Sequence, residues 1–186
     1  VHSQSSVIQQ VVVVPVKRTE FKTSWDTVGS VVAKSTMDMK PELEGKSYVV
    51  LRQLKPMARF DMIHEFRDLG VVPTSMIDCS DGLASEIIHL CNASGLGARI
   101  FEKNIPIDDE TYLAATEFNV SPLTAALNGG EDYELVFTVS QEDFPKIEKI
   151  ADVTAIGYMT NIGNERVMVM KSDAIVDLTA PGFGKG

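Results

Sequence analysis

Long apolar runs are absent from this sequence, and the longest, VVVV at Val11–Val14, ends at Pro15. A helix that spans a bilayer needs about 20 consecutive apolar residues, so the sequence predicts no membrane segment. The opening residues, VHSQSSVIQQ, also lack a basic cluster followed by an apolar stretch and a small-residue cleavage site. We therefore expect no signal peptide, no membrane partner and, by default, a cytoplasmic location.

Basic residues are scarce as well, since 17 Lys and Arg stand against 26 Asp and Glu, for a formal charge of −9. General nucleic-acid binding requires lysine and arginine to replace the counterions on phosphates. We therefore expect no nucleic-acid partner. An acidic protein that handles phosphates usually needs divalent cations as intermediaries.

Cysteine is nearly absent, with Cys79 and Cys91 as the two examples, and they form neither a Cys-x-x-Cys nor a Cys/His pattern. Free cysteine is among the most frequently buried residue types, so we expect reduced thiols in the core. The 44% hydrophobic content is ordinary for a soluble protein, and 186 residues are enough to bury a substantial core.

From Lys55 onward, helical and strand patterns alternate with clear punctuation by glycine and proline. The patterns predict helices at 56–69, 81–94, 109–118, 122–127 and 143–151, and strands at 71–77, 97–102, 133–139, 154–159 and 166–170. This order indicates an α/β or α+β domain with a mixed sheet flanked by helices.

The N-terminal part of the chain has a different texture. VVVVPV predicts one strand, but no long helix is patterned there and no complete domain can be derived. We therefore divide the chain into an unassigned segment, 1–38, and a C-terminal α/β domain, 39–186, that begins with an exposed connector at 39–46.

The stretch TSMIDCSDGLASEIIHLC, Thr74–Cys91, begins like a buried strand and ends like an amphipathic helix. We predict that Asp78 ends the strand, that Ser80 caps the helix and that Asp81 lies in its first turn. A serine cap with acids near the positive end of the helix dipole needs no function. This capping interpretation leaves Asp78 unexplained, because a carboxylate at the carboxyl end of a buried strand lies where open α/β sheets bind ligands.

The helix in this stretch is predicted to bury one face that carries Leu83, Ile87 and Cys91. Its opposite face carries Glu86 and His89. We expect that face to be solvated, so His89 is not expected to be a ligand.

A second stretch, ALNGGEDYELVF at Ala126–Phe137, places twin glycines immediately before acids. Gly129 and Gly130 allow a close approach of the backbone to a ligand, and Glu131 follows at once. Such pairs usually make only a turn. Two acidic turns in one domain nevertheless favour a site.

Taken together, MIDCSDGLASEIIHLC and ALNGGEDYELVFTV resemble the C-terminal half of the thiamine-monophosphate kinases, in order and in spacing. That family belongs to the superfamily of aminoimidazole ribonucleotide synthetase and selenophosphate synthetase. The resemblance covers roughly Pro41–Phe183, and LRQLKP at Leu51–Pro56 together with GGEDYEL favours the thiamine kinases over their cousins. It implies the fold of that superfamily's C-terminal domain and phosphoryl transfer from ATP to thiamine phosphate with Mg²⁺ as the cofactor.

The resemblance also implies roles for individual residues. Asp78 and Asp81 would be magnesium ligands, Ser80 would contact ATP, and Glu131 would contact thiamine phosphate. The family has a tail aromatic that packs on the substrate, and Phe183 stands at that place here. If Asp78 and Asp81 share bound cations, we expect their carboxylates to lie within about 6 Å of each other.

The complete kinases of the family carry an N-terminal domain with GDDA-like and GGDT-like motifs, which supplies further magnesium ligands and a homodimer interface. Neither motif is present here. The resemblance therefore implies a truncated form that is inactive alone and a possible homodimer. Two alternatives remain open: another ATP-dependent phosphotransferase of the same superfamily, or a non-catalytic binding or dimerisation module.

Overall fold

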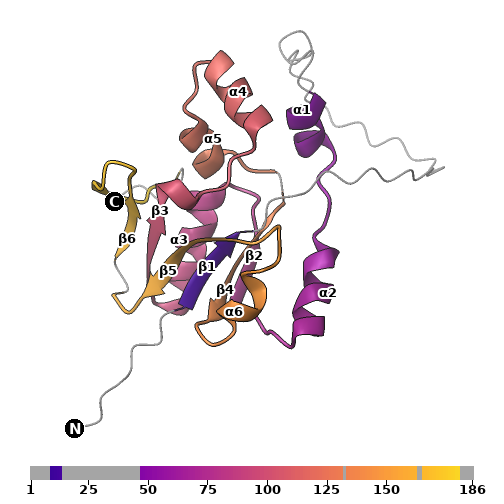
Figure 1. Cartoon of the computed structure of the whole chain (residues 1–186). Coiled ribbons are helices and arrows are strands. Elements are labelled where there is room, and N and C mark those ends of the chain that lie inside the picture. The colour runs from indigo at the N-terminus through magenta and orange to yellow at the C-terminus, as the bar shows by residue number, and fades with distance from the viewer. Residues whose placement is uncertain (1–8, 14–46, 132, 163–164, 181–186) are drawn as a thin grey trace, which may run out of the picture.

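The computed structural model describes residues 9–13, 47–131, 133–162 and 165–180. The helices are α1 (Ser47–Leu54), α2 (Phe60–Leu69), α3 (Leu83–Ser94), α4 (Asp109–Glu117), α5 (Pro122–Asn128) and α6 (Phe144–Ile147). The strands are β1 (Gln9–Val13), β2 (Ser75–Asp78), β3 (Gly97–Phe101), β4 (Leu135–Ser140), β5 (Thr154–Thr160), β6 (Arg166–Val169) and β7 (Ile175–Asp177). Helices flank a mixed sheet (Figure 1), which confirms the predicted fold class.

The sheet has the strand order β2-β4-β1-β5-β3-β6-β7. Neighbouring strands are antiparallel except for the parallel pair of β3 and β6. The strand predicted from VVVVPV is β1, and Val11 pairs with Thr138 of β4 on one side and with Gly157 of β5 on the other. Strand β1 thus comes from the segment left unassigned by the sequence, and the division of the chain after residue 38 stays a prediction.

Helices cover both faces of the sheet around β4. Helix α3 packs on one face, in a core that includes Val136, and helices α2 and α6 pack on the other, in a core that includes Phe137 (Figure 1). Residues 136–139 are therefore all buried. The prediction of a half-buried strand was wrong here, because β4 lies inside the sheet and between two helical layers.

Both cysteines are free and buried, as predicted. Burial raises the pKa of the Cys91 thiol to about 11, so this group stays protonated at neutral pH.

Within the described ranges, no helix is both long and apolar enough to cross a membrane.

Two glycines end helices as the sequence predicts, since Gly70 after α2 and Gly95 after α3 adopt left-handed backbone angles with φ of 63° and 67°. The predicted start of α2 at Pro56 is wrong, because the helix begins at Phe60. The preceding residue, Arg59, is drawn into the interior by acidic partners described below. Helix α6 is also shorter than predicted, and turns follow it.

Candidate functional site

The joint between β2 and α3 carries three of the residues singled out by the sequence. Asp78 is the last residue of β2, as predicted, and it is exposed. Ser80 and Asp81 lie in the connecting loop. Helix α3 begins only at Leu83, with Gly82 as its N-cap and no side-chain cap. The prediction that Ser80 caps the helix and that Asp81 lies in its first turn is therefore wrong. Gly82 has a φ of 109°, an angle that suits glycine alone.

Glu86 was predicted on the solvated face of the helix, but it is 2% exposed. Its carboxylate accepts a hydrogen bond at 2.9 Å from the backbone N–H of Asp81, in the loop before the helix. The positive end of the helix dipole also favours a carboxylate near the start of a helix. Glu86 therefore fixes the backbone that carries Asp81. The sequence offered one signal for this contact, because an acid in the first turns of a helix can reach back to the residues before the helix.

The two motifs lie against each other, although they are far apart in the sequence. The Glu131 N–H donates to the Ser80 carbonyl at 2.9 Å, and the Tyr133 N–H donates to the Cys79 carbonyl at 3.1 Å. In return the Cys79 N–H donates to the Glu134 carbonyl at 2.7 Å. The structure thus brings Asp78, Ser80, Asp81 and Glu131 onto two adjacent segments.

Glycine is required where these segments approach each other. A Cβ atom on Gly130 would lie 1.9 Å from the Ser80 carbonyl oxygen, and one on Gly82 would lie 2.7 Å from the Leu127 carbonyl oxygen. Real Cβ contacts are not that short, so a side chain at either position would push the backbones apart. Gly130 thus approaches the backbone of the other motif closely, whereas the close approach of the twin glycines to a ligand stays a prediction.

Tyr133 is a site residue that sequence analysis missed, because the alternation of residues placed it inside a strand. Glu131 and Tyr133 both adopt left-handed backbone angles, with φ of 68° and 53°. The Tyr133 hydroxyl donates to a Glu131 carboxylate oxygen at 2.9 Å. This hydrogen bond raises the pKa of Tyr133, and the negative charges of Asp78 and Asp81 raise it further.

The acids of the joint have no basic partner among the described residues. Asp78, Asp81 and Glu131 take part in none of the ion pairs found among the described residues. In the same part of the chain, no group of three or more acids, histidines and cysteines is arranged to hold a metal ion. The separation of about 6 Å expected for a cation shared by Asp78 and Asp81 stays a prediction. Phe183, the predicted tail aromatic, lies outside the described residues.

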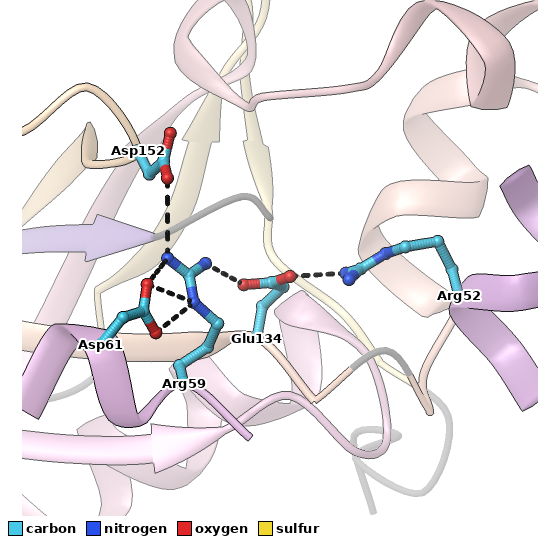
Figure 2. Close-up of polar contacts among 5 residues, drawn as sticks. All are labelled: Arg52, Arg59, Asp61, Glu134 and Asp152. Carbon is cyan, nitrogen blue, oxygen red and sulfur yellow. Dashed lines mark hydrogen bonds and ion pairs between the residues drawn. The ribbon is translucent and has the colours of Figure 1, made fainter. Parts of the chain in front are cut away.

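A group of ion pairs surrounds Glu134, the residue that follows Tyr133 in the second motif (Figure 2). Glu134 is 5% exposed and contacts Arg52 at 2.5 Å and Arg59 at 2.9 Å. Arg59 also donates to both carboxylate oxygens of Asp61, and it lies 3.9 Å from a carboxylate oxygen of Asp152. We call these five residues the Glu134 bridge. It joins α1, the start of α2 and the GGEDYEL segment.

Charges within the Glu134 bridge offset part of the cost of burial. Burial raises the pKa of the Glu134 carboxyl, and both arginines oppose that rise. Burial also lowers the pKa of Arg59, but the hydrogen bonds and charges of Asp61 and Glu134 together raise it above the ordinary arginine value. The hydrogen bond from Arg59 lowers the pKa of Asp61. Removing Arg59 would therefore leave the buried Glu134 carboxylate with one cationic partner instead of two.

The bridge connects the two sequence features that had distinguished the thiamine kinases from their cousins. Arg52 belongs to LRQLKP and Glu134 belongs to GGEDYEL. Sequence analysis did not find this contact, because opposite charges in two distant segments are too common to predict a pair. The observed pairing indicates that LRQLKP supports the second motif.

A family model described as AIR synthase related protein, C-terminal domain, matches residues 27–170. Over 115 residues the chain is 39% identical to the thiamine-monophosphate kinase of Escherichia coli strain K12, a match that covers 60% of this chain and 31% of that protein. Over 138 residues it is 35% identical to the thiamine-monophosphate kinase of Buchnera aphidicola subsp. Schizaphis graminum, covering 67% of this chain and 41% of that protein.

Among solved structures, AaThiL complexed with AMPPCP and TMP has a similar fold, with a TM-score of 0.62 and 23% sequence identity. That match covers 89% of this chain and 48% of the AaThiL chain. The chain thus spans 31% to 41% of the length of these two curated relatives.

Proposed function

The chain belongs to the family of AIR synthase related proteins, as their C-terminal domain, and from this premise we propose that its parent protein is a thiamine-monophosphate kinase. Such an enzyme transfers the γ-phosphoryl group of ATP to thiamine phosphate. The proposal is supported by similarity to curated thiamine-monophosphate kinases and by the AMPPCP and TMP bound to AaThiL. The observation that carries it is the packing of the Asp78–Asp81 loop against the loop of Glu131.

The chemistry explains why acids are needed at this joint. A negatively charged phosphate must approach a negatively charged nucleotide, so catalysis consists mainly of positioning and charge neutralisation. Asp78 and Asp81 fit a hard cation, because carboxylate oxygens are the ligands that Mg²⁺ prefers. Among the described residues, no basic side chain forms an ion pair with either aspartate. Bound Mg²⁺ would supply positive charge to the phosphate oxygens.

The other site residues have complementary proposed roles. Ser80 offers a hydroxyl to ATP, and Glu131 offers a carboxylate to the cationic thiamine part of the substrate. Phe183 would stack on the thiamine ring. We also propose that the parent protein is cytoplasmic and homodimeric, and that residues 39–186 form its C-terminal domain.

In the family, the GDDA-like and GGDT-like motifs supply further magnesium ligands, and neither motif is present in this sequence, so part of the phosphate charge would stay unneutralised. We therefore expect this chain alone to form no measurable thiamine diphosphate, whereas the full product of its gene should do so. The measurement is ADP release and thiamine diphosphate formation from ATP, thiamine phosphate and Mg²⁺. Omission of thiamine phosphate controls for background ATP hydrolysis. Turnover of a different phosphorylated acceptor would favour another phosphotransferase of the superfamily, and absence of any turnover by the full product would favour a binding module.

Replacement of Glu131 by glutamine tests the substrate assignment. The amide keeps the shape but loses the charge, so we expect kcat/KM of the full enzyme for thiamine phosphate to fall about tenfold or more, and kcat/KM for ATP to fall less. Steady-state kinetics with each substrate varied in turn provide the measurement. Glu148→Gln is the matched control, because Glu148 is an exposed glutamate at the end of α6. An equal or larger loss for ATP would remove Glu131 from the thiamine phosphate site.

A further inference from the structure

We propose that Tyr133 is a positioning residue for the thiamine phosphate site, because its hydroxyl holds the Glu131 carboxylate in the orientation that meets the substrate. The inference rests on the proposed function and deepens it. Neither the resemblance of the two motifs nor the helix and strand patterns had indicated a role for Tyr133 at the site.

The contact between the two side chains is built into an unusual backbone. Glu131 and Tyr133 are both left-handed, with φ of 68° and 53°, and their side chains meet at 2.9 Å. A left-handed conformation costs a residue other than glycine about 1–2 kcal/mol. Strain of this kind persists only where the surrounding structure enforces it. Two such residues in one loop therefore point to a geometry that the fold maintains.

Contacts on both sides of the loop enforce that geometry. Upstream, Gly130 packs against Ser80, whose carbonyl accepts the Glu131 N–H. Downstream, the Tyr133 N–H bonds to Cys79 and the Glu134 side chain enters the Glu134 bridge. The backbone of Glu131 is thus fixed, but its side chain is exposed and would rotate freely without a partner. Tyr133 supplies the hydrogen bond that restrains it.

A tyrosine suits this task better than a cation would. Its neutral hydroxyl orients the carboxylate of Glu131 without cancelling the negative charge, which remains available for a cationic thiamine ring. The Tyr133 N–H bonds to the carbonyl of Cys79, the residue after Asp78, and the Tyr133 hydroxyl bonds to Glu131. Tyr133 therefore contacts both the segment of the proposed metal ligands and the proposed substrate residue.

Tyr133→Phe in the full product of the gene tests the role, since it removes only the hydroxyl. We expect the KM for thiamine phosphate to rise about three- to tenfold, the effect of one ordinary net hydrogen bond, because this contact is exposed to solvent. The KM for ATP and kcat should change less than twofold by the same reasoning, because the backbone contacts to Cys79 and Ser80 remain. Tyr112→Phe, on the exposed face of α4, is the matched control and should leave both KM values unchanged.

A double-mutant cycle separates positioning from general support of the fold. In a Glu131→Gln background, Tyr133→Phe should cause little further change, because its effect is transmitted through the carboxylate. Independent, multiplicative effects, or an equal rise of both KM values, would overturn the inference while leaving the proposed function intact. Failure of the wild-type full product to bind thiamine phosphate in a calorimetric titration would overturn both. Thermal unfolding of each variant identifies any loss of folded protein.

Discussion

Gly130→Ala is expected to reduce kcat/KM of the full enzyme by about 100-fold or more and to destabilise the fold by about 1–3 kcal/mol. The added Cβ would lie 1.9 Å from the Ser80 carbonyl oxygen, and this neighbour is backbone that cannot rotate away. The two motif segments must then separate, which displaces Glu131 from Ser80 and from Asp78. Steady-state kinetics and urea unfolding followed by circular dichroism measure the two effects.

Gly95→Ala provides the control for backbone strain. Gly95 has a φ of 67°, but a Cβ there meets nothing within 4 Å. We therefore expect a loss of stability of about 1 kcal/mol and unchanged kinetics. If Gly130→Ala proved no more harmful than Gly95→Ala, the close packing of the two motifs would have no functional importance.

Features that depend on neighbouring residues were predictable from the sequence. The position of Asp78 at a strand end, the glycine that ends α3 and the span of α4 all follow from local periodicity and glycine placement. The strand in VVVVPV was found in the same way, from a run of β-branched residues. The sequence contains no equally local signal for the place of this strand in the middle of the sheet.

Features that depend on distant partners could not be predicted from pattern alone. Glu86 lies on the polar face of its helix in sequence, yet it is buried because the loop before the helix turns back over it. Arg59 is buried because Glu134 and Asp61 contact its guanidinium. Neither acid stands three or four residues from Arg59, so helical periodicity could not predict these contacts. Tyr133 alternates correctly for a strand, but contacts with Cys79 impose a left-handed angle instead. In each case tertiary contacts decide the outcome.

Arg59→Met should destabilise this chain by about 3–5 kcal/mol, the usual cost of removing one partner from a buried ion pair. Methionine retains the volume of the aliphatic part of the side chain, so the loss measures the charge and its hydrogen bonds. Glu134 would keep Arg52 but lose its second partner, and Asp61 would lose a bidentate contact. Equilibrium unfolding in urea, monitored by far-ultraviolet circular dichroism, determines the change.

Two further variants identify the buried charge as the cause. Arg67→Met removes an arginine whose ion pair with Asp68 is exposed on both sides, so it should cost less than about 1 kcal/mol. Arg59→Met combined with Glu134→Leu removes positive and negative charge together, and stability should recover in part, because apolar replacements of whole buried pairs are often nearly neutral. If Arg59→Met cost no more than Arg67→Met, the Glu134 bridge would not be what holds the GGEDYEL segment to α2. If the same double variant, made in the full product of the gene, regained stability without regaining activity, the bridge would serve chiefly to place Glu131.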